Sequence, residues 1–142
     1  MTQLIPYLAF DNTKEALSYY EEVFGATDVQ RLPVGKEQAG QFGIDPEQAN
    51  NMTMHSEFKV AGHTLYAADK FNKAGDFNSS ISLSINWQKD NAEETKAMTE
   101  LFERIAAHPE TTVDMPIGEQ FWGGVMGALK DKYGVDWMFN GN

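Results

Sequence analysis

The stretch that decides the fold is the C-terminal segment Glu119–Asn140, EQFWGGVMGALKDKYGVDWMFN. Aromatic residues and valines mark its two ends, Phe121–Leu129 and Val135–Phe139, and the charged segment Lys130–Gly134 separates them. Two runs that favour strands on either side of a turn containing glycine predict a β-hairpin. Working outward from this hairpin, we predict that it closes the second of two similar modules.

The first module begins with an apolar strand over 4–10 and a helix that follows it. Asn12 precedes Glu15 by three residues, which is the spacing of a capping box, and Gly25 stands where a helix C-cap is expected. Between them, apolar residues recur at helical spacing. Further strands are predicted over 26–32, 52–60 and 63–69, and a linker over 70–79.

A long excursion, residues 33–51, separates the second and third of these strands. Its glycines and prolines predict a loop, and Asp45 followed by Pro46 predicts one short helical turn. Long loops in compact domains are often lids or binding loops. We therefore weigh a mobile lid over a binding site against a connection with no role.

The second module repeats this order. A strand is predicted over 80–87, then a helix capped by Asp90 with Glu93 and ended before Pro109. A weak strand over 111–115 and a loop over 116–120 lead into the terminal hairpin. Asn12 and Asp90 lie 78 residues apart, and so do Phe24 and Phe102. A constant offset between two similar units indicates an internal repeat of β-α-β-β-β modules, about 1–75 and about 78–142.

Two strands alternate clearly between apolar and polar residues. Met54, Phe58 and Val60 share one face of the first, and His55 and Glu57 share the other. In the strand 80–87, leucine, isoleucine and tryptophan share one face, and the other carries Ser82 and Ser84. We expect the apolar faces to lie under the helices.

Composition narrows the classes of function. The 142 residues carry a net charge of −10, which argues against nucleic acid or an anionic membrane as the main partner. The absence of cysteine excludes disulfides, thiolate nucleophiles and Cys-ligated metals. No apolar run approaches the roughly 20 residues of a spanning helix. The N-terminus has no basic region followed by an apolar run, so we expect no signal peptide and a cytoplasmic protein.

Three stretches resemble one known family. PYLAFDNTKEALSYYEEVFGA, MHSEFKVAGHTLYAAD and FWGGVMGALKDKYGVDWMFN are similar to the PhnB-like branch of the vicinal oxygen chelate superfamily. That superfamily includes glyoxalase I, bleomycin-resistance proteins and extradiol dioxygenases. The branch is often labelled 3-demethylubiquinone-9 3-methyltransferase-like, but the chain has no GxGxxG loop between a strand and a helix.

The resemblance implies an α+β, glyoxalase-like fold in which paired modules curl a mixed sheet into a cup around a small-molecule ligand. Such relatives also imply a homodimer. We expect His55 and Glu57 to act as base and orienter. The residues expected to line the cavity are Ser82, Ser84, Tyr66, Trp122, Asp69 and Met138.

In this superfamily a divalent metal takes ligands from the first and last strands of each module. Aligning the helix starts places those positions near Ile5, near Ser82 or Leu83, near Tyr66 and at Met138. None supplies an imidazole or carboxylate, so we expect no metal and no other cofactor. The predicted function is binding of a small organic molecule, with its transformation left open. The alternatives are a divalent-metal-dependent lyase or dioxygenase, with His55 and Glu57 holding the ion, a drug-sequestering protein, and an interaction module without a ligand.

Overall fold

The computed structural model describes residues 2–71 and 75–142, and the chain divides into two compact units, 1–74 and 75–142. Each unit contains a four-stranded mixed sheet and one α-helix, in the order β-α-β-β-β. The predicted α+β fold of two such modules is confirmed. The predicted linker over 70–79 includes residues 72–74, which lie outside the described residues. No helix in the described part of the chain is both long and apolar enough to cross a membrane.

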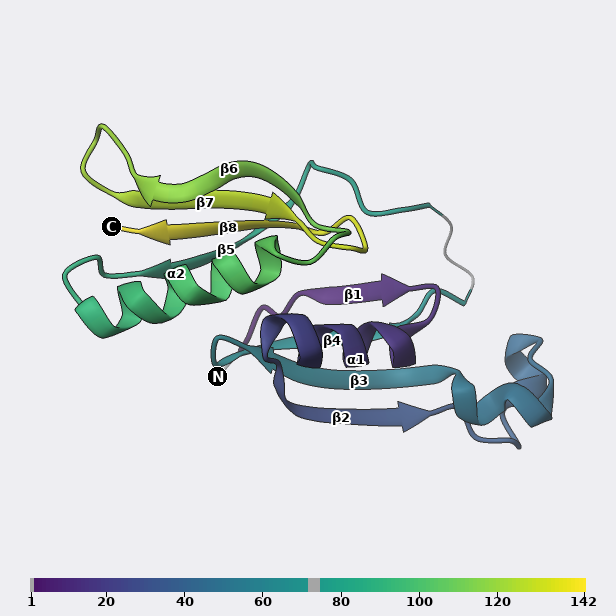
Figure 1. The fold of residues 1–142 in the computed structure, drawn as a ribbon. Helices are drawn as coiled ribbons and strands as arrows, with labels where there is room; N and C mark the ends of the chain where they lie inside the picture. The colour runs from purple at the N-terminus through teal and green to yellow at the C-terminus, as the bar shows by residue number, and fades with distance from the viewer. Residues whose placement is uncertain (1, 72–74) are drawn as a thin grey trace. The chain divides into compact units, whose positions relative to one another are not determined.

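Unit 1 places its four strands in the order β1-β4-β3-β2, with β1 parallel to β4 and the other pairs antiparallel. Helix α1 lies across one face of this sheet (Figure 1). The elements of unit 1 are β1 (Tyr7–Phe10), α1 (Thr13–Phe24), β2 (Thr27–Pro33), η1 (Ala39–Phe42), η2 (Pro46–Asn51), β3 (Thr53–Val60) and β4 (His63–Asp69).

Helix α1 forms where its capping residues predict it. The Asn12 side chain accepts from the backbone N–H of Glu15 at 3.1 Å, and Gly25 ends the helix with a φ of 68°. Tyr20 is fully buried and stacks on Phe58 of β3, with ring centroids 5.4 Å apart. The face of β3 that carries Phe58 and Val60 therefore lies under α1, as predicted. Ser56, the polar exception on this face, donates to the carbonyl of Ala67 at 2.7 Å.

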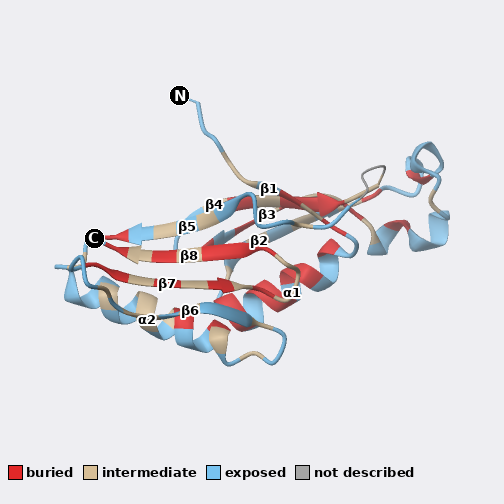
Figure 2. Ribbon diagram, turned by 90° about the horizontal axis from the view of Figure 1, so that it is seen from above, coloured by how far each residue is buried: buried red, intermediate tan, exposed pale blue. Residues whose placement is uncertain are grey.

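The excursion between β2 and β3 contains two 3₁₀-helices and a small core of its own. Val34, Ala39 and Ala49 are buried there, and Met54 packs against them rather than under α1. The Asp45 side chain accepts from Glu47 N–H at 3.0 Å with Pro46 in the first turn, so the predicted helical turn is confirmed. Figure 2 shows that most of the surrounding excursion is exposed. Whether it acts as a lid stays a prediction.

Unit 2 repeats the sheet order as β5-β8-β7-β6, with β5 parallel to β8. Burial is heaviest along β7 and β8 (Figure 2). Trp87, at the end of β5, donates from Nε1 to Thr95 Oγ1 of α2 at 3.0 Å, which places the apolar face of β5 under that helix. The elements of unit 2 are β5 (Ser82–Trp87), α2 (Ala92–Ala106), β6 (Thr112–Glu119), β7 (Val125–Lys130) and β8 (Asp136–Gly141).

The cap of α2 lies one residue later than the sequence predicts. Asn91, not Asp90, accepts from the backbone of Glu94 at 3.0 Å, and the Glu94 carboxylate accepts from Asn91 Nδ2 at 2.7 Å. The offset between the two helix caps is therefore 79 residues rather than 78. Asp90 and Asn91 are both good N-caps with a glutamate three residues on, so local preference does not separate them.

The start of the terminal hairpin also differs from the prediction. Strand β6 continues to Glu119, through the segment expected to be a loop, and residues 121–124 form the turn rather than a strand. Gly123 has a φ of 96°, and its carbonyl accepts from Lys89 Nζ at 2.6 Å. A positive φ suits glycine and fixes the turn here. Gly127, by contrast, is a packing glycine, since an added Cβ would lie 2.8 Å from Phe102.

Asp131 is the largest correction in this region. The predicted turn over 130–134 is rich in charged residues, which are usually exposed, but Asp131 is only 3% exposed. Its carboxylate accepts from the backbone N–H groups of Tyr133 and Val135 and from the indole N–H of Trp137, at 2.8 to 3.1 Å. The turn between β7 and β8 is thus organised around a buried charge that its neighbours satisfy.

Candidate functional site

Each sheet has one face under its own helix and one face turned away from it, which we call the open face. Because side chains alternate along a strand, Phe58 under α1 places His55 and Glu57 on the open face of the first sheet. Tyr66 pairs with Glu57 on one side and with Tyr7 on the other, so both tyrosines share that face.

Three rings gather there, and we call Tyr7, His55 and Tyr66 the aromatic cluster. The Tyr7 hydroxyl lies 2.8 Å from His55 Nδ1. The ring centroids of His55 and Tyr66 are 4.8 Å apart in an edge-to-face arrangement, and those of Tyr7 and Tyr66 are 5.7 Å apart. Tyr7 is 55% exposed, and His55 and Tyr66 are partly buried. The cluster therefore offers ring surface and polar atoms that remain accessible.

The charges around the aromatic cluster are few. Glu57 lies on the same face, two residues along β3 from His55, or roughly 7 Å at strand rise. Lys59 lies two residues further and is paired with Asp28 at 3.9 Å. Because Lys59 is paired and lies further along β3, Glu57 is the charged side chain nearest to His55 on this strand.

Asp69, expected to line the cavity, lies on the helix-covered side of β4. It is 5% exposed, and its two oxygens accept from the backbone N–H groups of Thr13 and Thr53, at 2.9 and 3.2 Å. It therefore joins the N-terminus of α1 to the start of β3. The structure does not bring it together with His55 and Tyr66, which lie on the other face.

The open face of the second sheet has a different character. Cross-strand pairing sets Ser82, Asp136 and Lys130 in one row, and Ser84, Met138 and Ala128 in the next. Lys130 Nζ bonds the Asp136 carboxylate at 3.1 and 3.2 Å and the Ser79 hydroxyl at 3.0 Å. Ser82, Ser84 and Met138, predicted separately, thus lie together beside an ion pair.

A cavity of about 330 Å³ lies over this ion pair. Ser82, Asp114 and Met138 are among its lining residues, with Lys130 and Asp136 at its polar side. Trp122 is absent from this cavity, since it lies in the turn between β6 and β7, half exposed and in edge-to-face contact with Phe121 at 4.9 Å.

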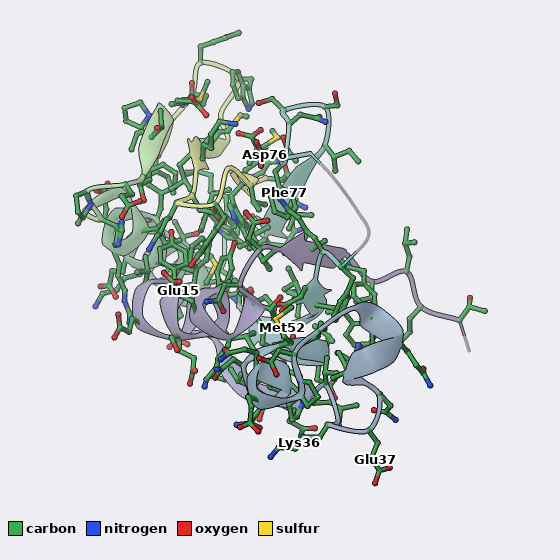
Figure 3. All side chains as sticks on the ribbon, turned by 90° about the vertical axis from the view of Figure 1, so that its right-hand side faces the viewer. Glu15, Lys36, Glu37, Met52, Asp76 and Phe77 are labelled. Carbon is green, nitrogen blue, oxygen red and sulfur yellow. The ribbon has the colours of Figure 1, made fainter. Side chains whose placement is uncertain are left out.

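A larger cavity, about 570 Å³, lies beside the N-terminus of α1, where Glu15, Met52 and Asp69 contribute to its wall. Figure 3 labels Glu15 and Met52, and it shows Lys36 and Glu37 of the excursion pointing outward. Lys14 crosses toward η2 and donates to Asn51 Oδ1 at 3.3 Å. The polar atoms here mostly bond one another or the backbone, so this cavity is the weaker candidate.

The positions that the superfamily resemblance assigns to metal ligands, near Ile5, Ser82 or Leu83, Tyr66 and Met138, carry no imidazole or carboxylate. In the register of the strands, Tyr66 pairs with Tyr7, and Met138 pairs with Ser84. Within residues 2–71 and 75–142, no three His, Asp or Glu side chains come together as a metal site would require.

Sequence reasoning missed Tyr7, Lys130 and Asp136. Tyr7 stands in a short apolar run, and nothing local indicates that its hydroxyl meets a histidine 48 residues away. Lys130 stands in the charged segment of the predicted turn and Asp136 in the predicted last strand, and the structure makes them cross-strand partners. The alternation of the last strand contains the only signal, since Asp136 and Met138 share a face.

Comparison with known proteins adds to this geometry. The family model described as 3-demethylubiquinone-9 3-methyltransferase matches residues 2–139. Protein YjdN of Escherichia coli K12 is 26% identical over 144 residues, with 96% of this chain and 93% of that protein covered.

The crystal structure of PA1353 from Pseudomonas aeruginosa is 30% identical with a TM-score of 0.68, covering 100% of this chain and 98% of that one. A PhnB protein from Bacillus cereus is 21% identical with a TM-score of 0.65, covering 99% and 100%. The fold is also shared by a glyoxalase-related enzyme from Fulvimarina pelagi and by FosX from Listeria monocytogenes, a fosfomycin resistance protein, each with a TM-score of 0.60. Their identities are 18% and 12%, and they cover 100% of this chain and 89% and 93% of theirs.

Proposed function

The chain belongs to the 3-demethylubiquinone-9 3-methyltransferase family, in the PhnB-like branch of the vicinal oxygen chelate superfamily, and we propose that its aromatic cluster binds a small organic molecule. The observation that carries the proposal is the 2.8 Å hydrogen bond between Tyr7 and His55 on an open sheet face. Small-molecule sites combine ring surface with a few fixed polar groups. The cluster supplies both.

The site works without a divalent metal. The family positions carry the alkyl chain of Ile5, the hydroxyl of Ser82 or alkyl chain of Leu83, the phenol of Tyr66 and the thioether of Met138, which are poor ligands for hard or borderline divalent ions. His55 and Glu57 offer two ligands where three are usual for a catalytic ion. Elemental analysis of the purified protein is expected to find no stoichiometric zinc, nickel or iron. Bound metal that His55→Ala removes would establish the metalloenzyme alternative instead.

The binding proposal is tested by thermal shift against a panel of small phenols, electrophiles and cationic drugs. A ligand at one hundred times its dissociation constant stabilises the folded state by about 2.7 kcal/mol. Tyr66→Leu and His55→Ala are expected to abolish the shift. His63→Ala is the matched control, because His63 is an exposed histidine at the other end of the same hairpin. Stabilisation that survives both cluster variants would move the site elsewhere.

A homodimer is part of this proposal. Several large apolar side chains are exposed in the single chain, among them Leu4 at 100% and Ile81 at 76%. Large apolar side chains left exposed in each unit support association with a second copy, which would bury them. Sedimentation velocity is expected to give the mass of a dimer, and a monomer at micromolar concentration would contradict it.

A further inference from the structure

Either residue can donate the hydrogen bond between Tyr7 and His55, and we assign the donor role to Tyr7, because a phenol O–H is a stronger acid than the N–H of a neutral imidazole. A neutral imidazole has one protonated and one unprotonated ring nitrogen, and the nitrogen that accepts a hydrogen bond is the unprotonated one. With Tyr7 donating to Nδ1, the imidazole proton is on Nε2. The Tyr7 oxygen keeps its own lone pairs and lies on a side chain that is 55% exposed. The Tyr7 oxygen can therefore accept a proton from a ligand, while its own proton points at His55 Nδ1.

We infer that the Tyr7–His55 pair takes a proton from the ligand, and that the ligand is a weakly acidic hydroxyl compound such as a phenol or an enol. This inference rests on the proposed binding function and goes beyond it by naming the ligand class. The ligand O–H proton moves to the Tyr7 oxygen while the Tyr7 hydroxyl proton moves to His55 Nδ1. The products are a ligand oxyanion, a neutral tyrosine and an imidazolium, so no oxidant or further reactant is required.

Few charged side chains face the pair. Glu57 on β3 lies on the same face as His55, two residues along the strand. Lys59, the cation further along β3, is paired with Asp28 of β2. On β4, Tyr66 contacts both members of the pair in T-shaped arrangements. On β2, the register partner of His55 is the apolar and largely exposed Leu32.

The rings of the cluster favour an aromatic or conjugated hydroxyl compound. Tyr66 is in a T-shaped arrangement with Tyr7 and with His55, so the three rings lie at different angles. Aromatic pairs prefer offset or edge-to-face contact, and an incoming ring meets such partners here. A saturated alcohol would gain less contact, and its hydroxyl is far too weak an acid for imidazole to deprotonate.

The first test needs no ligand. Long-range ¹H–¹⁵N spectra of the histidine side chains are expected to show His55 with an unprotonated Nδ1 and a protonated Nε2. Tyr7→Phe removes only the hydroxyl and is expected to shift the Nδ1 resonance of His55. The resonances of His63 and His108 should stay unchanged. A proton on Nδ1 in the neutral wild-type protein would overturn the inference while leaving the binding proposal intact.

The second test uses 4-nitrophenol, whose phenolate absorbs at longer wavelength than the phenol. The titration is performed at a pH at which the free probe is mostly un-ionised. The wild-type protein is expected to bind it as the phenolate, and Tyr7→Phe is expected to lower the bound ionised fraction at least about tenfold, equivalent to 1.36 kcal/mol. 4-Nitroanisole has the same ring without the acidic hydroxyl, so its binding measures ring contact alone. His63→Ala should behave like the wild type.

The outcomes separate the two proposals. Bound 4-nitrophenol that stays un-ionised in the wild type would overturn the proton transfer and leave small-molecule binding standing. Ionisation that persists in Tyr7→Phe would exclude Tyr7 as the acceptor. If neither probe binds, both proposals fall. Because Tyr7 is half exposed, its phenylalanine variant is expected to fold normally, which circular dichroism checks.

Discussion

The two units share one topology and differ in what their helices bury. Helix α1 buries seven side chains, including both Tyr19 and Tyr20, whereas α2 buries only Phe102 and Ile105 among its fifteen residues. The open faces differ as well, since the first carries a phenol–imidazole bond and the second an ion pair. A repeated frame of strands and caps is thus compatible with different cores and different chemistry.

The largest difference in stability is expected between substitutions on the two helices, because α1 buries more side chains than α2. Tyr20 is fully buried between α1 and Phe58, so Tyr20→Ala should lower the free energy of unfolding by about 3–5 kcal/mol. Thr99 lies 79 residues later on α2 and is only partly buried. Thr99→Ala should lower the free energy of unfolding by less than about 1 kcal/mol. Urea titrations measure both, and equal losses would show that the two helices are packed alike.

The buried carboxylates differ in what they join. Asp131→Ala leaves three donors unsatisfied, two backbone N–H groups before β8 and the Trp137 indole on β8, and Asp69→Ala leaves two donors from separate elements. Each change should destabilise the fold by roughly 3 kcal/mol, because a buried donor without a partner costs about 1–3 kcal/mol. The exposed Asp114 is the control and should cost less than about 0.5 kcal/mol on change to alanine.

Thermal unfolding gives these stabilities, and Trp137 fluorescence should report Asp131→Ala directly, since the indole loses its acceptor. A tryptophan spectrum unchanged by that substitution would contradict the role assigned to Asp131 in the turn.

Gly127 and Gly118 both lie on strands of the second sheet, but only Gly127 is closely packed. Gly127→Ala places a methyl group 2.8 Å from Phe102 and 2.9 Å from the backbone of Ile117, so a loss of about 1–3 kcal/mol is expected. Gly118→Ala meets nothing within 4 Å on the neighbouring strand and should be close to neutral. Denaturation midpoints distinguish them, and comparable losses would mean that Gly127 is needed for another reason.

Substitutions at the two helix N-caps should have the smallest effects on stability, and the two effects should be similar in size. Asn12→Ala and Asn91→Ala each remove an N-cap acceptor and should cost about 1 kcal/mol. Asp90→Ala should cost less than about 0.5 kcal/mol, because Asp90 does not cap α2. A larger loss at Asp90 than at Asn91 would restore the 78-residue offset that the sequence suggested.

Local signals determined the frame of this protein. The Asn12 cap, the Gly25 C-cap and the alternation of β3 depend on residues close together in the chain, and each is confirmed within a residue or two. The errors fell where two local choices were nearly equal, as with Asp90 and Asn91. They also fell where glycine and aromatic residues fit either a strand or a turn, as in residues 121–124.

The chemistry of the open faces was decided by tertiary structure. His55 and Tyr66 could be placed on a face by alternation, but parallel pairing of β1 with β4 is what brings Tyr7 beside Tyr66 and within hydrogen-bond distance of His55. The charged chain neighbours of Asp131 give no sign of its burial, which depends on contact with Trp137 of β8. Alternation and caps act over a few residues, whereas the partner of a polar side chain depends on which distant strand lies alongside it.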